Sequence, residues 1–250
     1  METGKINFIK IARTIDIETI KSHPILDIAA RFWEPERYEA AKICYYVFRE
    51  IDDLIDNRKA EGSKITDKEK IHLEAVVKKW VRVMTSDMSD LTPEKKFLKE
   101  ITKFQIPARA WESFGKSMLY DIYHEGFKTF SDFLSYAEGA CVAPASIFIH
   151  FCGCTKKNDT YDPPCFDIFK AARPISIFSY LVHIIRDFKK DHYENLNYFT
   201  RDLLKEMGVK PQTLNQAARG VITKEFRWLI NRYKVLINQF KIKSRNEINR

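Results

Sequence analysis

The stretch 36–61 contains neither glycine nor proline, and its apolar residues recur at helical spacing. Cys44, Phe48, Ile51 and Ile55 follow one another at steps of four, three and four, so a helix places them on one face. Glycine and proline are scarce in the whole chain, with 8 and 9 among 250 residues. Low content of both favours helix over sheet. The sequence therefore predicts an all-α fold, and because no linker or repeat divides residues 1–250, we expect one domain.

Capping signals and apolar periodicity place the individual helices. Thr66 and Glu69 form a capping-box pattern, and prolines open other helices because a first-turn residue needs no amide partner. An apolar-periodic piece lies near 6–20, and we expect a loop over 153–163. The expected helices are 35–59, 66–85, 92–104, 107–125, one capped by Thr129 or Ser131 that runs to Cys152 with a kink at Pro144, 165–190, a short one at 200–207, and a long one to the C-terminus.

A second face of the helix over 35–59 carries chemistry. Tyr45, Arg49, Asp52 and Asp56 share this face beside the apolar stripe, and Asp53 adjoins it. Two carboxylates four residues apart can hold Mg²⁺ together with substrate phosphates. An isolated pair of this kind is more often a solvated acidic edge, so a second copy elsewhere decides between the two interpretations.

The second copy lies on the helix over 165–190. Tyr180, His183, Asp187 and Asp191 share one face at steps of three, four and four, and Arg186 adjoins them. Four carboxylates meeting at one end of a bundle would repel one another unless cations neutralise them. Magnesium ions and a diphosphate substrate would resolve that repulsion together, and an apolar interior would hold the hydrocarbon chain.

Charge and cysteine content restrict partners and compartment. Residues 201–250 hold 12 Lys or Arg against 4 Asp or Glu, which accounts for the entire net charge of +8. This basic end is a solvated helix face or a peripheral contact with an anionic membrane surface. No nucleic-acid motif accompanies it. Five unpaired-looking cysteines, no leader-like N-terminus and no run of about 18 apolar residues predict a cytoplasmic protein without a membrane span.

The two aspartate motifs resemble those of the squalene/phytoene synthase family of head-to-head prenyltransferases. The first reads Ile-Asp-Asp-Leu-Ile-Asp over 51–56, and the second Ile-Ile-Arg-Asp-Phe-Lys-Lys-Asp over 184–191. Between them, 118–121, 127–129 and Tyr136 with its following small residues are also similar to the family's middle helices. The resemblance covers roughly 22–210. It implies a helical bundle of the class I isoprenoid synthase type with a central apolar cavity.

The resemblance also implies roles for particular residues. Mg²⁺ (or Mn²⁺ in its place) and diphosphate would be bound by the aspartates of the two motifs, Asp52, Asp56, Asp187 and Asp191, with Asp53 beside them. Substrate and phosphate would be contacted by Tyr45, Arg49 and Arg186. Tyr198 follows the second motif as in the family. For Gly139, Ala140 and Ala143 we expect a place along the hydrocarbon tunnel, although close helix packing explains small residues equally well. Use of NADPH stays open, since no dinucleotide fingerprint is present.

The implied reaction joins two allylic diphosphates, with farnesyl diphosphate favoured, through a cyclopropylcarbinyl diphosphate to a squalene, dehydrosqualene or phytoene type of product. The chain departs from the family pattern at Tyr180 and His183, where Gln and Asn are usual, and at Lys190 and Leu196. It lacks the serines expected around 24–27 and ends earlier than the pattern. These departures leave two alternatives: a class I terpene synthase that ionises one prenyl diphosphate, and a non-catalytic assembly or lipid-binding relative.

Overall fold

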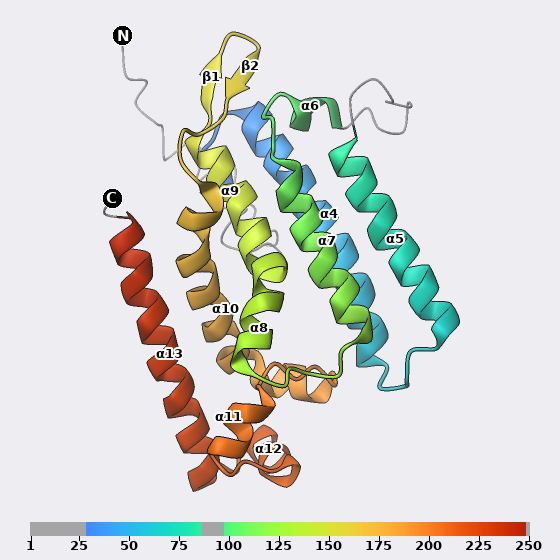
Figure 1. The fold of residues 1–250 in the computed structure, drawn as a ribbon, viewed down its shortest axis with the longest axis vertical. Helices are drawn as coiled ribbons and strands as arrows, with labels where there is room; N and C mark the ends of the chain where they lie inside the picture. Colours follow the sequence, from blue (N-terminus) through green and yellow to red (C-terminus); the bar gives the residue numbers. More distant parts are fainter. Residues whose placement is uncertain (1–28, 87–97, 249–250) are drawn as a thin grey trace.

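The computed structural model describes residues 29–86 and 98–248, and most of these residues are helical, which confirms the all-α class (Figure 1). The predicted piece near 6–20, the serine-poor segment 24–27 and the helix start at Thr92 lie outside the described residues. The elements are α4 (Pro35–Ala60), α5 (Asp67–Thr85), α6 (Leu98–Thr102), α7 (Ala108–Tyr123), α8 (Phe130–Ala137), the π-helix η3 (Glu138–Val142), α9 (Ala143–Gly153), β1 (Thr155–Lys157), β2 (Thr160–Asp162), α10 (Ile168–Tyr193), α11 (Arg201–Glu206), α12 (Pro211–Ala218) and α13 (Lys224–Ile248).

The predicted helix boundaries follow from local chemistry. Thr66 accepts a hydrogen bond from the backbone of Glu69, whose carboxylate accepts one from Thr66 N at 2.7 Å, so the capping box forms as predicted. Thr129 forms a second capping box, with Asp132. Gly62, with φ of 73°, follows the end of α4 in a conformation that other residues seldom adopt.

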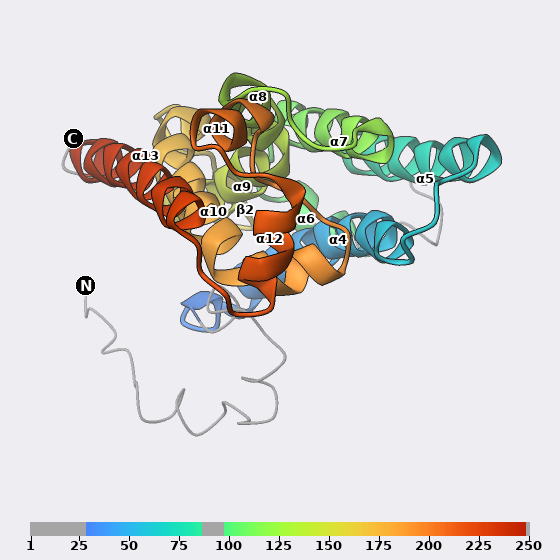
Figure 2. The ribbon, with the colours of Figure 1, turned by 90° about the horizontal axis from the view of Figure 1, so that it is seen from below.

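The long helices pack side by side around one hydrophobic core. α5 lies at one edge against α7, and α13 lies at the opposite edge against α10, an arrangement visible in both views (Figures 1 and 2). α10 lies between α13 and α9. In the core, the rings of Phe48 and Trp111 stack with centroids 4.7 Å apart, and this pair joins α4 to α7. The apolar stripe predicted on α4 is buried at Cys44, Phe48, Ile51 and Ile55.

Three local predictions need correction. The segment 153–163 is not a plain loop, because β1 and β2 pair as a small antiparallel hairpin whose turn includes Asn158 at φ 53°. Pro211 opens a further helix, α12, which the sequence pattern did not reveal. The helix expected from Thr129 to Cys152 is divided by η3: Pro144 has no N–H to offer the carbonyl four residues earlier, and the wider turn just before it accommodates this gap.

One helix among the described residues, α10, is long and apolar enough to cross a membrane by length and composition. The sequence had predicted none. Because α10 packs against α9, η3, α12 and α13, its apolar character matches that of a central helix in a bundle.

Candidate active site

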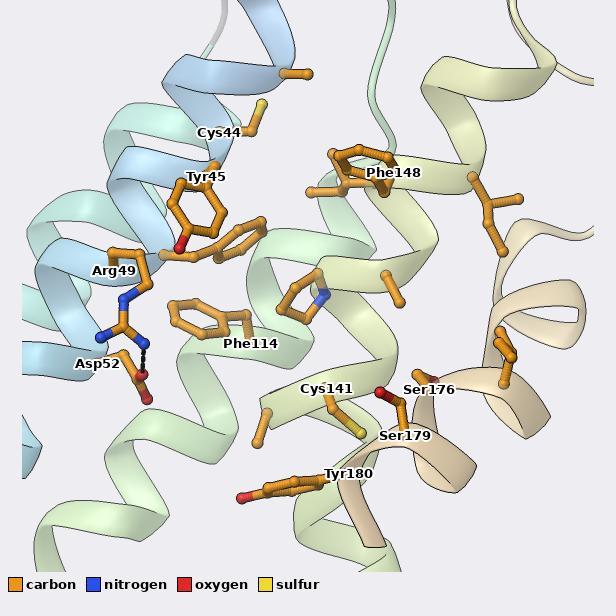
Figure 3. A pocket seen from close by; sticks show the side chains of 18 of the residues that line it. Cys44, Tyr45, Arg49, Asp52, Phe114, Cys141, Phe148, Ser176, Ser179 and Tyr180 are labelled. Atoms are coloured by element: carbon orange, nitrogen blue, oxygen red, sulfur yellow. Dashed lines mark hydrogen bonds and ion pairs between the residues drawn. The ribbon is translucent and has the colours of Figure 1, made fainter. Parts of the chain in front are cut away.

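A cavity of about 440 Å³ opens between α4, η3, α9 and α10 (Figure 3). Its walls are mostly apolar, with Phe114, Ile147, Phe148 and Phe151 among them. Polar groups gather toward one end, where Tyr45, Arg49 and Asp52 of α4 lie across from Tyr180 of α10. Here we call this end the polar mouth. The predicted central apolar cavity is thereby present, and helices from both aspartate motifs form its walls.

Arg49 holds the aspartates of α4 in place at the polar mouth. Its guanidinium donates to Asp52 at 2.9 Å and also to Asp53. Asp52 and Asp53 lie three and four residues after Arg49, so one side chain on this helix can reach both. Asp56, a further turn along, is not one of the carboxylates that this guanidinium bonds, and burial, Asp52 and Asp121 raise its pKa by more than Lys59 and Arg49 lower it.

Burial and mutual repulsion raise the pKa values of both site aspartates on α4. The pKa of Asp52 rises to about 6, chiefly because burial disfavours its charge, with Asp121 and Asp53 adding to the rise and Arg49 opposing it. The pKa of Asp56 rises to about 8, again through burial first and then through Asp52 and Asp121. Such a pair is short of positive charge, which is the electrostatic condition that a bound cation would relieve.

A buried ion pair joins the end of α4 to α7 close to these aspartates. Asp121 accepts hydrogen bonds from Lys59 Nζ at 2.6 Å and His124 Nε2 at 2.5 Å. Gly126 N donates to His124 Nδ1, so the imidazole carries its proton on Nε2. Burial raises the pKa of Asp121, but the bonds from His124 and Lys59 outweigh that effect and hold its pKa below the usual value. Asp121 is therefore an anion with Lys59 as its own counter-ion.

The α10 side of the mouth has a different charge balance. Arg186 forms a two-point contact with Asp187 at 2.7 Å for each bond, which lowers the pKa of Asp187. Burial and Asp187 raise the pKa of Asp191 to about 6. His183 lines the cavity one turn before Asp187, and partial desolvation together with Arg186 lowers its pKa, which favours a neutral imidazole.

The two aspartate pairs stay separate across the mouth. The charges that act on Asp52 and Asp56 belong to α4 and α7, whereas those that act on Asp187 and Asp191 belong to α10 and the turn after it. Within residues 29–86 and 98–248, no three His, Cys, Asp or Glu side chains meet closely enough to form a ready-made metal cluster. Both motif helices therefore line the cavity, but of the four aspartates only Asp52 is among its lining residues, and α10 contributes Tyr180 and His183 instead.

An aromatic cluster packs behind Tyr180, the member of the cluster that lines the first cavity. The rings of Tyr180 and Tyr198 lie edge to face with centroids 5.9 Å apart, and Phe133 lies 5.5 Å from Tyr180. Tyr136, fully enclosed by its neighbours, packs 5.1 Å from Phe127. Burial raises the pKa of Tyr136, Tyr180 and Tyr198 well above the usual value, so all three keep their phenolic protons.

The small residues after Tyr136 divide between two functions. Ala140 lines the cavity, as expected. Gly139 does not: a Cβ there would collide with the carbonyl of Ser113 and the side chain of Ser117, so this glycine lets η3 approach α7. Ala143 is completely buried and lies outside the cavity lining. For Gly139 and Ala143, close packing is the correct explanation and the tunnel assignment is wrong.

A further cavity of about 420 Å³ adjoins the buried ion pair. Lys59, Lys64, Lys70, Asp121 and His124 are among its lining residues, and loops after α4, α7 and α10 complete it. Its walls are much more polar than those of the first cavity. A hydrocarbon chain therefore fits the first cavity and not this one.

The comparisons with known proteins agree with this geometry. The model of the squalene/phytoene synthase family matches residues 27–241, nearly the whole chain. The chain belongs to the squalene/phytoene synthase family. A solved structure described as a dehydrosqualene synthase in complex with ligand is similar in fold, with a TM-score of 0.67 and 13% identity over 93% of this chain and 75% of that one. The search of curated protein sequences found no match.

This squalene/phytoene synthase family member is accordingly a prenyltransferase by family, with the bundle fold of an isoprenoid synthase. The family generally depends on divalent metal. The donor set fits Mg²⁺ in the usual protein manner, in which one or two carboxylates bind the ion and substrate phosphates and waters complete its octahedron. Asp52 with Asp56, and Asp191 with Asp187, are the pairs that would hold it.

Sequence reasoning gave no role to four residues around this site. Lys59 and His124 were not singled out, and Asp121 and Tyr136 entered only as points of resemblance. The spacing did contain a signal, because Lys59 lies three residues after Asp56 and His124 three residues after Asp121. What the sequence lacks is the contact between the two helices, since 62 residues separate Lys59 from Asp121.

Proposed function

We propose that this protein condenses two allylic prenyl diphosphates head to head, with farnesyl diphosphate as substrate and Mg²⁺ as cofactor. One observation supports this above all: an apolar cavity of about 440 Å³ is lined by Arg49 and Asp52 of α4 and by Tyr180 and His183 of α10. Such a site suits a long hydrocarbon attached to a diphosphate. Family membership supports the head-to-head chemistry.

The chain's own residues account for binding and for protection of the reactive carbon. Arg49 and Arg186, each already oriented by an aspartate, would bind phosphate oxygens through charge-assisted hydrogen bonds. A bound Mg²⁺ would neutralise diphosphate charge and make it a better leaving group. The apolar wall would exclude water, and the rings of Tyr180 and Phe114, which line the cavity, would stabilise the allylic cation left after diphosphate departs.

The second candidate is a class I terpene synthase that ionises one prenyl diphosphate. The first cavity is apolar and is lined by Asp52 of the first motif, whereas the second is polar. One hydrocarbon site would favour single-substrate chemistry. Tyr180 and His183, which replace the family's usual amides, point in the same direction.

Incubation with farnesyl diphosphate and Mg²⁺, followed by mass spectrometry of extracted products, distinguishes the candidates. A C30 hydrocarbon or its cyclopropyl diphosphate supports condensation. Farnesol or cyclic C15 products alone would refute condensation and favour the terpene synthase. Asp52→Asn should reduce diphosphate release at least ~100-fold, in the range seen when a group that stabilises transition-state charge is removed. Glu39→Gln, an exposed acid on the same helix, is the matched control.

If diphosphate release survives both Asp52→Asn and Asp187→Asn unchanged, the aspartates have no part in it. That result would return the non-catalytic alternative, an assembly or lipid-binding protein, to first place. An intact fold should be confirmed for each variant by its circular dichroism spectrum.

A further inference from the structure

The outer face of α13 combines an apolar line with basic flanks. Trp228, Val235 and Ile242 follow one another at intervals of seven residues, or about two helical turns, so they form one line along the helix. Their exposed fractions are 47%, 50% and 51%, although side chains of this kind are commonly buried. Here we call these three residues the outer stripe.

The fold explains why this stripe is not core. The opposite face of α13 is buried against the bundle through Phe226, Leu229, Tyr233, Leu236 and Phe240, chiefly against α10. α13 lies at the edge of the bundle in both overall views (Figures 1 and 2), and in the described part of the chain no helix packs on its outer side. The outer stripe is therefore a second apolar face that folding does not require.

Basic residues flank the stripe. Arg227, Lys234 and Lys241 each immediately precede a member of the stripe, so they lie in a parallel row beside it, and Arg245 continues that row. All four are exposed, and none forms an ion pair with another described residue. Lys224 adds a cation 4.7 Å from the Trp228 ring centre. The only acids on this helix are Glu225 and Glu247.

We propose that the outer stripe of α13 binds the surface of an anionic lipid bilayer. Tryptophan and aliphatic side chains enter the interface between headgroups and acyl chains, while lysine and arginine bind acidic headgroups. A second copy of the chain is a poorer occupant despite the seven-residue spacing. In an antiparallel helix pair, the basic rows of the two copies would lie side by side, and like charges at short range repel.

Vesicle co-sedimentation of the full chain tests the proposal. We expect binding to vesicles of phosphatidylcholine mixed with phosphatidylserine, weak binding to phosphatidylcholine alone, and release by high salt. The double variant Lys234→Gln/Lys241→Gln should lower the partition coefficient ~25-fold, because each basic residue near an anionic surface contributes roughly a fivefold factor. Lys79→Gln/Lys116→Gln removes the same charge from exposed sites on α5 and α7, at the far side of the bundle, and should leave binding unchanged.

A fluorescence measurement separates insertion from simple charge attraction. The emission of the wild-type protein should shift to shorter wavelength with phosphatidylserine vesicles, and Trp228→Phe should lose that shift while the other three tryptophans remain. Equal binding of the α13 double variant and its control would overturn the proposal. So would a concentration-dependent dimer that Trp228→Ser abolishes, because the stripe would then be an interface between copies. Unchanged thermal unfolding of each variant shows that the fold is intact.

Discussion

Asp56→Asn should stabilise the metal-free protein, and the gain should grow with pH. The pKa of Asp56 is raised from 3.8 to about 8 by burial and by the carboxylates of Asp52 and Asp121. Below the unfolded-state pKa, the Asp56 carboxyl is protonated in both states and has no effect on the free energy of unfolding. As pH rises toward about 8, the Asp56 carboxyl loses its proton in the unfolded chain but keeps it in the folded chain. The free energy of unfolding therefore falls.

The size of the effect follows from the shift. One pKa unit corresponds to about 1.4 kcal/mol, which sets an upper limit of about 6 kcal/mol for a shift of this size. Because the side chain of Asp56 is not fully buried, solvent screening reduces the expected value to about 2 kcal/mol. Asparagine has nearly the same shape and no charge, so it should remove the cost without leaving a cavity.

The assay is urea unfolding followed by circular dichroism, in a chelator, at about pH 5 and about pH 9. The wild type should lose about 2 kcal/mol more than Asp56→Asn across this interval, and Glu39→Gln should behave as the wild type. Added Mg²⁺ should raise the stability of the wild type at the higher pH and have much less effect on Asp56→Asn. If wild type and Asp56→Asn lose stability in parallel, the idea that this carboxylate is short of positive charge is wrong.

Two further substitutions test the contacts around the site. Lys59→Met should cost about 3 kcal/mol of unfolding free energy, because it leaves the buried carboxylate of Asp121 without its main cation. The double variant Lys59→Met/Asp121→Asn should recover most of the loss. If it does not, Lys59 contributes to stability through packing alone. Gly139→Ala should cost about 1–3 kcal/mol through overpacking against α7. Ala140→Gly next to it is the control, and a denaturation midpoint for Gly139→Ala equal to the wild type would contradict the close approach.

The parts of this fold that depend on local chemistry could be predicted from the sequence. The helix starting at Pro35, the capping box at Thr66 and the end near Gly62 depend only on neighbouring residues. The face shared by Tyr45, Arg49 and Asp52 follows from helical periodicity alone. These features need no knowledge of what the helix packs against.

The remaining features depend on contacts between distant segments. No spacing reveals that Lys59 and His124 both bind Asp121, or that Gly139 is required by the carbonyl of Ser113. The sequence also could not predict the separate charge balance of the two aspartate pairs, because that balance depends on the contact between Arg186 and Asp187. Which basic residue neutralises which aspartate depends on contacts in the folded chain, whereas a sequence pattern shows only which residues could take part.

The π-helix at 138–142 has a consequence for how cavity shape can change. Buried positions run along this rod at 133, 137, 142, 146 and 150, so one interval is five residues where the others are four. One residue of an α-helix corresponds to about 100° of rotation. Loss of a single residue within the wide turn would therefore leave an ordinary α-helix, and the wall built by Ala145 and Phe148 would keep its orientation. Loss of a residue from the regular turns of α9 would instead rotate the part of this wall that follows it by about 100°, so the π turn is the place in this rod where a change of length spares the cavity.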